Sequence, residues 1–180
     1  MVKNDLEVLF DLSYNSVWKS QFLCIKEVDF PLYLIQQSKL RFKPHQIVDR
    51  VLLSHKKNFA FELKHSKTSS IALDRIKPHQ IKFLNDFEQF CGSGFFIFSF
   101  EGLKYIFLIN IHQYLKIIQH IEKKSINMSD LQANPTILKI SQIKINAHRQ
   151  KKVLNLSSIL FPDQNRIENF LNLNAQEIDR

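Results

Sequence analysis

The fold is decided by two neighbouring stretches, FAFELKH at residues 59–65 and IVDRVLL at residues 47–53. Both are rich in β-branched, aromatic or leucine side chains, and the polar link Ser54–Lys57 between them is typical of a hairpin turn. We therefore expect two antiparallel strands. Side chains alternate between the two faces of a strand, so Glu62 and Lys64 share one face at a spacing of about 6.7 Å.

Asp49 is an acidic residue inside the apolar run of the first strand, 13 positions before Glu62. Pairing of the strands through the turn brings the two carboxylates side by side. At ~4 Å they would repel by about 4 kcal/mol at an effective dielectric constant of about 20, and a hard cation would relieve this repulsion. Mg²⁺ commonly binds through one or two carboxylates plus substrate phosphate. Lys64 would orient the attacking water or stabilise the charge that develops on phosphorus, so the pattern indicates a metal-dependent phosphodiesterase.

A simpler interpretation is that Glu62 and Lys64 form the solvated face of an antiparallel strand, because Glu-x-Lys often occurs by chance. Three further features favour a functional site. They are the carboxylate in the preceding strand, the basic character of residues 41–80, and a following helix that presents His79 and Gln80. Together these features are more specific than Glu-x-Lys alone.

Helical periodicity and boundary residues predict the flanking elements. The first helix is expected to begin at Asn4 or Asp5 and to run to about Gln21, and a second helix begins at Pro78 with Gly92 as its C-cap. The other expected elements are weak strands or irregular connections at 22–25 and 32–35, strands at 95–100 and 104–109 joined across Glu101-Gly102, a helix at 112–121, an alternating stretch at 137–145 and a short helix at 166–171.

Composition excludes several classes of protein. With three glycines, the sequence contains neither the dinucleotide-binding nor the P-loop glycine motif. Cys24 and Cys91 are far apart and lack a CxxC partner, which argues against zinc ribbons, redox motifs and a disulfide framework. No apolar run reaches the ~20 residues that span a bilayer, and Asp5 and Glu7 lie where a signal peptide would be apolar. We expect a soluble, cytoplasmic protein.

The charge is concentrated in two segments. The chain has 25 Lys and Arg against 17 Asp and Glu. Residues 41–80 carry nine basic and three acidic side chains, and seven basic side chains lie between Lys123 and Lys152. Two basic stretches suggest a surface that binds a polyanion such as nucleic acid. A pI near 9.5 also fits a lysine-rich proteome, so charge supports nucleic-acid binding without establishing it.

Several motifs, taken in order, resemble those of the RecU-type Holliday junction resolvases in the PD-(D/E)xK nuclease superfamily. The matching pieces are LEVLFDLSYNS at 6–16, Asp49, FELKHSKTSS at 61–70, PHQIKFL at 78–84, GSGFFIFSF at 92–100 and KKSINMSDLQ at 123–132. The resemblance covers most of the chain. One departure is that the family usually shows a glycine shortly after the motif aspartate, whereas Arg50 and three apolar residues follow here.

The resemblance implies an α/β, restriction-endonuclease-like fold, with a mixed β-sheet flanked by helices and an αβββαβ core. Residues 1–180 would form a single nuclease domain. Within it, residues 27–46 would correspond to a shortened stalk, and residues 122–152 would form a basic C-terminal segment.

The resemblance also implies roles for individual residues. Asp49 and Glu62 would hold Mg²⁺, with Mn²⁺ as its substitute, and Lys64 would be the catalytic lysine. Gln80 would lie at the metal near the scissile phosphate, and Glu7 would be a further catalytic carboxylate. DNA would be contacted by Lys64, Ser66, Lys67, Lys123 and Lys124.

The expected function is Mg²⁺-dependent cleavage of four-way DNA junctions in recombination and repair. The enzyme would be a homodimeric endonuclease associated with the nucleoid, with a recombinase or branch-migration protein as a further partner. Two alternatives stay open: a branched-DNA-binding protein that has the nuclease fold without catalysis, and a nuclease of the same superfamily with another DNA target, such as restriction or repair.

Overall fold

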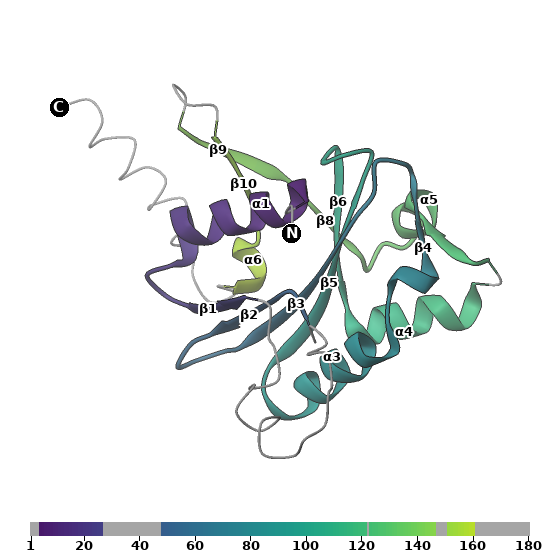
Figure 1. Ribbon diagram of the computed structural model, residues 1–180, viewed down its shortest axis with the longest axis horizontal. Coiled ribbons are helices and arrows are strands. Elements are labelled where there is room, and N and C mark those ends of the chain that lie inside the picture. The colour runs from purple at the N-terminus through teal and green to yellow at the C-terminus, as the bar shows by residue number, and fades with distance from the viewer. Residues whose placement is uncertain (1–3, 27–47, 122, 147–150, 161–180) are drawn as a thin grey trace, which may run out of the picture.

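The protein is a mixed α/β structure, seen in a computed structural model that describes residues 4–26, 48–121, 123–146 and 151–160 (Figure 1). Its elements in chain order are α1 (Asp5–Ser13), the π-helical turn η1 (Tyr14–Trp18), β1 (Leu23–Lys26), β2 (Arg50–Leu53), β3 (Phe59–His65), β4 (Ser70–Ala72), the 3₁₀ turn η2 (Leu73–Arg75), α3 (Pro78–Phe90), β5 (Ser93–Phe100), β6 (Tyr105–Asn110), α4 (Ile111–His120), β7 (Ser125–Asn127), α5 (Met128–Gln132), β8 (Leu138–Ile140), β9 (Gln142–Asn146), β10 (Lys151–Leu154) and α6 (Ser157–Leu160).

A six-stranded mixed sheet in the order β1-β2-β3-β5-β6-β8 organises the molecule. Helix α1 covers one face of this sheet, and α3 and α4 lie against the other (Figure 1). Alternation along β3 explains the two layers: Phe59, Phe61 and Leu63 pack with α1, whereas Ala60 packs with the α3 and α4 side chains. This is the fold class that the sequence predicted.

The predicted hairpin is present, and its strands are antiparallel. Arg50 lies opposite Phe61 and Leu52 opposite Phe59. The side chain of Ser54 accepts hydrogen bonds from two backbone N–H groups of the turn and donates to the carbonyl of Lys57, which closes the link between the strands. Strand β2 begins at Arg50, so Asp49 lies immediately before the ladder.

The first helix begins as predicted and ends earlier than expected. The Asn4 side chain accepts a hydrogen bond from the Glu7 N–H, as an N-cap should. The α-helix ends at Ser13, and η1 follows. A π-helical turn changes the direction in which side chains project, and here Trp18 is buried against Phe10 at a ring distance of 5.4 Å.

Helix α3 has the predicted bounds, but its end differs from the expected glycine cap. The C-cap is Cys91, and no residue there has a positive φ. Gly92 is required for another reason, since a Cβ at this position would lie 2.0 Å from the Asn58 carbonyl oxygen. In the turn between β5 and β6 the backbone is left-handed at Glu101 and Gly102, with φ of 48° and 71°.

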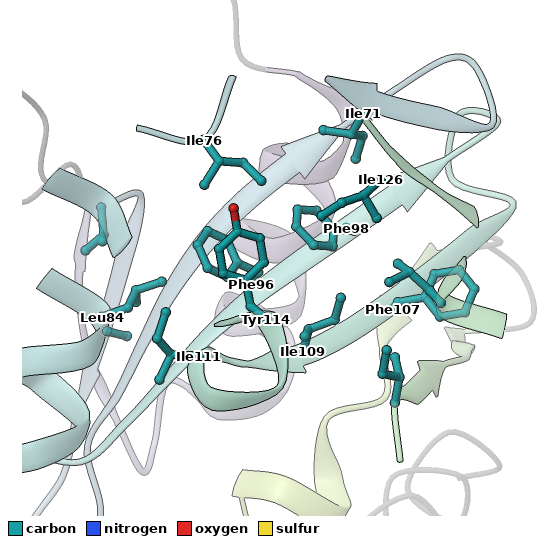
Figure 2. Close-up of a cluster of buried hydrophobic side chains, with 14 of the residues drawn as sticks. Ile71, Ile76, Leu84, Phe96, Phe98, Phe107, Ile109, Ile111, Tyr114 and Ile126 are labelled. Carbon is teal, nitrogen blue, oxygen red and sulfur yellow. The ribbon is translucent and has the colours of Figure 1, made fainter. Parts of the chain in front are cut away.

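Parallel pairing of β3 with β5 is the central feature of the sheet, and α3 makes the crossover between them. Phe96 and Phe98 of β5 face α4, where the ring of Tyr114 lies 4.5 Å from that of Phe96 (Figure 2). Leu84 of α3 and Ile126 of β7 join the same buried cluster. The phenylalanine-rich strand is therefore core, as its composition predicts.

The sequence did not predict the two-stranded sheet formed by β4 and β7. The alternating stretch at 137–145 forms β8 and β9 rather than one strand. The expected stalk at 27–46 and the expected helix at 166–171 lie outside the described residues.

Candidate active site

The β2–β3 hairpin brings the two predicted carboxylates together. Continuing the register Arg50↔Phe61 by one residue places Asp49 opposite Glu62. Asp49 Oδ2 accepts a hydrogen bond from the Leu63 N–H at 2.7 Å, so the aspartate side chain is anchored on the backbone of β3. The predicted convergence of Asp49 and Glu62 is confirmed.

Glu62, Lys64 and Gln80 form a closed network beside this pair. Lys64 Nζ lies 2.8 Å from Glu62 Oε1 and donates to Gln80 Oε1 at 3.1 Å. Gln80 Nε2 donates to Glu62 Oε1 at 2.6 Å. Strand β3 supplies the two charged groups, and α3 supplies the amide, so the network depends on packing of α3 against the sheet.

Gln80 also occupies the third position of α3, where helices need acceptors for free N–H groups. Its Oε1 accepts from the Lys77 N–H at 3.0 Å in addition to Lys64 Nζ. Two donors at Oε1 fix the orientation of the amide, because the Nε2 hydrogens must then point toward an acceptor, here Glu62. In this arrangement the amide oxygen is already engaged by two donors.

The network is buried, which corrects the interpretation of Glu62 and Lys64 as a solvated strand face. Glu62 is 2% exposed and Lys64 is 8% exposed. In the parallel register, their neighbours on β5 are Phe96 and Phe98, both wholly buried. A carboxylate among phenylalanines loses hydration, so burial is the main cause that raises the pKa of Glu62.

The pKa shifts show how close the charges lie. Burial and the nearby charge of Asp49 raise the pKa of Glu62 to about 8, although Lys64 acts in the opposite direction. Burial also raises the pKa of Asp49, against the lowering effects of the Leu63 N–H, Lys64 and Arg50. Perturbed carboxylates next to a lysine are typical of functional sites.

The donor set fits a hard divalent cation that completes its coordination with water and substrate oxygens. Glu62 Oε2 is buried and has no hydrogen-bond partner among the described residues. A cation at that oxygen would satisfy it and would offset the repulsion from Asp49. Within residues 4–26, 48–121, 123–146 and 151–160, no group of three or more His, Cys, Asp or Glu side chains is positioned to hold a metal.

Glu7, the further carboxylate expected from the resemblance, lies near Arg50 on the α1 side of the sheet. Its Oε2 is 3.8 Å from Arg50 Nη2. Arg50 also donates from Nε to Asp11 Oδ1 at 2.9 Å and from Nη1 to the Asp49 carbonyl oxygen at 2.7 Å. Sequence reasoning missed this cluster. The available signal was an arginine inside an apolar strand, because a buried charge needs partners.

The residues other than Lys64 that are expected to contact DNA lie just before the paired strands β4 and β7 in the sequence. Lys67, Lys123 and Lys124 are exposed, whereas Ser66 is buried with its hydroxyl 2.9 Å from that of Thr68. Pairing of β4 with β7 joins the segment that follows Lys64 to the start of the basic segment, and the Leu73 N–H donates to the Lys124 carbonyl. Their contact with DNA stays a prediction.

Among the described residues, no helix has the length and hydrophobicity needed to cross a membrane.

Comparisons with known proteins were made on the whole chain. None of the curated proteins searched matches it. A structure search matches the chain to Hjc, a Holliday junction resolvase from Archaeoglobus fulgidus, with 15% identity and a TM-score of 0.44 over 70% of this chain and 88% of that one. A family model described as "Recombination protein U" matches residues 4–151, a span that contains the hairpin carboxylates, Lys64 and Gln80. Since this match covers far more than half of the sequence and agrees with the motif order, the chain belongs to the RecU family of Holliday junction resolvases.

Proposed function

We propose that this protein is a divalent-metal-dependent endonuclease that cuts four-way DNA junctions during recombination and repair. The observation that carries the proposal is that Asp49 lies beside the buried network that contains Glu62 and Lys64. A paired carboxylate site beside an ammonium group suits hydrolysis of a phosphodiester, in which negative charge builds on the phosphoryl oxygens. Family membership supports DNA junctions as the substrate.

Asp49 and Glu62 would hold the metal, with Mg²⁺ as the proposed ion and Mn²⁺ as its substitute. The bound ion would supply a Lewis acid and lower the pKa of a coordinated water. The buried Glu62 Oε2 has no hydrogen-bond partner among the described residues. The raised pKa of Glu62 means that its charged form is unfavourable, and a nearby positive charge would stabilise it. Both properties favour a cation at this oxygen.

Lys64 would stabilise the charge on the phosphate, and Gln80 would hold Lys64 and Glu62 in place. Lys64 Nζ is shared by Glu62 and Gln80. The hydrolytic step would form a bond from a water oxygen to phosphorus and break the bond from phosphorus to the leaving sugar oxygen. Because Gln80 Oε1 also accepts a hydrogen bond from the Lys77 N–H, the network is tied to the start of α3.

We also propose a two-fold homodimer with basic surfaces along the DNA arms. Symmetric incision of a four-way junction needs two sites related by a dyad, which a homodimer provides. Lys67, Lys123 and Lys124 are exposed and would bind phosphates of the arms without reading bases. A recombinase or branch-migration protein would be a further partner of the same complex.

The test is cleavage of a labelled four-way junction with and without Mg²⁺. The wild type should nick the junction only with the metal. Glu62→Gln should lower the rate at least 100-fold and leave junction affinity within about threefold, because it removes a metal ligand and no surface charge. Asp86→Asn is a matched control, since Asp86 pairs with Lys82 on the exposed side of α3, and it should cut at the wild-type rate.

Two other outcomes would select the alternatives. A wild-type protein that binds junctions and never cuts them across Mg²⁺ and Mn²⁺ titrations would be a DNA-binding protein without catalysis. Equal cutting of junction, flap and linear duplex DNA would indicate a nuclease with another target.

A further inference from the structure

Arg50 is the most deeply buried basic residue described, with 0% of its surface exposed. It lies opposite Phe61, whose ring packs 5.3 Å from that of Phe10 on α1. Its side chain therefore projects to the α1 side of the sheet, away from the face that carries Glu62. A guanidinium in this position loses its hydration and must be compensated by fixed partners.

The partners come from α1 and from the chain next to Arg50 itself. Nε donates to Asp11 Oδ1 at 2.9 Å, and Nη2 lies 3.8 Å from Glu7 Oε2. Lys26 of β1 pairs with the other oxygen of Asp11 at 3.0 Å. The remaining bond is short and specific, since Nη1 donates to the backbone carbonyl of Asp49 at 2.7 Å.

This bond connects α1 to the peptide unit that carries a proposed metal ligand. Asp49 lies immediately before the β2–β3 ladder, which begins at Arg50. The Asp49 carboxylate is anchored on the other side by the Leu63 N–H. Rotation of the Asp49 peptide would break the hydrogen bond from Arg50 to the Asp49 carbonyl. It would also move the Asp49 carboxylate away from the Leu63 N–H.

We propose that Arg50 is a positioning residue, held by Glu7 and Asp11 of α1, which fixes the Asp49 peptide so that its carboxylate faces Glu62. The inference rests on the proposed function for its catalytic consequence. It also gives Glu7 a role through Arg50. The rival explanation is that the cluster only stabilises the packing of α1 on the sheet.

The first measurement needs neither metal nor DNA. Amide hydrogen exchange followed by NMR measures how strongly the Leu63 N–H is protected. This N–H donates a hydrogen bond to the Asp49 carboxylate. In Arg50→Lys, which keeps the charge and loses the planar fork, the Leu63 amide should exchange at least fivefold faster. The Ile97 amide in the centre of β5 should keep its wild-type rate. A Leu63 rate within twofold of the wild type would overturn the proposal.

The second measurement is Mn²⁺ affinity by electron paramagnetic resonance, together with kcat and KM on junction DNA. Arg50→Lys should weaken Mn²⁺ binding about tenfold and lower kcat at subsaturating metal, with KM for DNA within twofold. Lys26→Met is the control, because it removes another partner of Asp11 and leaves the guanidinium contacts intact. It should match the wild type in both assays.

A neutral triple variant, Glu7→Gln/Asp11→Asn/Arg50→Met, covers the case in which Arg50→Lys does not fold. Replacing a buried ionic cluster by neutral groups of similar size often preserves stability, whereas removing one partner does not. The triple variant should fold and still show the fast Leu63 exchange and weak Mn²⁺ binding. Wild-type values for both would show that the cluster is only structural. If wild-type protein neither binds Mn²⁺ nor cuts DNA, the proposed function fails, and the Leu63 exchange rates still decide the positioning role.

Discussion

Glu62 shows how one residue can couple stability to pH. Its pKa is raised to about 8, first by burial and then by Asp49, so the folded protein keeps a proton that the unfolded chain releases above a pKa of about 4.5. Between these two values the native state binds more protons than the unfolded state. The free energy of unfolding therefore decreases as pH rises through this window and levels off above it.

We predict that Glu62→Gln removes most of this pH dependence in metal-free protein. The wild type should lose a few kcal/mol of stability between pH 5 and pH 9, since one unit of pKa shift corresponds to about 1.4 kcal/mol, and Asp49 adds to the loss because its pKa is also raised. Urea unfolding at several pH values measures the slope. Glu101→Gln, at an exposed turn position, should behave as the wild type. Equal slopes for Glu62→Gln and wild type would contradict the raised pKa.

At the scale of elements, the site depends on how closely α3 approaches β5. Gln80 reaches Glu62 from the first turn of α3, and Leu84 lies one turn further along the same helix. A Cβ on Gly94 of β5 would lie 2.6 Å from the Leu84 carbonyl oxygen. Glycine at this position therefore permits the helix-to-sheet spacing on which the Gln80 contacts depend.

We predict that Gly94→Ala destabilises the protein by about 1–3 kcal/mol, the usual cost of overpacking a close contact. It should also lower the cleavage rate more than the stability loss explains, since α3 must shift with Gln80. Urea unfolding and junction cleavage below the unfolding transition measure the two effects. Gly102→Asn is the control, because nothing lies within 4 Å of a Cβ there and asparagine tolerates a positive φ. If Gly94→Ala changes neither the stability nor the cleavage rate, the contact between Gly94 and Leu84 has room to relax.

At the scale of the whole molecule, two lysine pairs lie on different elements. The ladder of β4 with β7 places Lys123 and Lys124 next to the segment that follows Lys64, and Lys56 and Lys57 lie on the β2–β3 turn. Both pairs are exposed. A double substitution at either place removes the same charge, so the two can be compared directly.

We predict that Lys123→Ala/Lys124→Ala weakens binding to all DNA sequences alike and lowers the slope of log affinity against log salt by about 1–2, since each lost phosphate contact changes the slope by ~0.9. Lys56→Ala/Lys57→Ala should leave the slope within about 0.5 of the wild-type value. Fluorescence anisotropy at several salt concentrations provides the slopes. A wild-type slope for the first variant would place DNA elsewhere on the molecule.

The sequence alone determined the features that arise from neighbouring residues. The β2–β3 hairpin follows from two β-rich runs around a polar turn, the start of α1 from its Asn4 cap, and the bounds of α3 from Pro78 and the helical spacing behind it. The convergence of Asp49 and Glu62 was predictable for the same reason, because a hairpin pairs residues that are close in the chain. The motif order also predicted the family.

Only the tertiary structure decided the features that depend on distant segments. Parallel pairing of β3 with β5 places Glu62 and Lys64 beside buried phenylalanines and so turns a plausible solvated face into a buried network. The orientation of the Gln80 amide depends on two donors, Lys64 of β3 and the Lys77 N–H at the start of α3. The environment of Arg50 depends on α1, which begins 45 residues earlier in the sequence. Periodicity and propensity describe contacts within a few residues, whereas burial, pKa and charge pairing depend on which surfaces meet when the chain is folded.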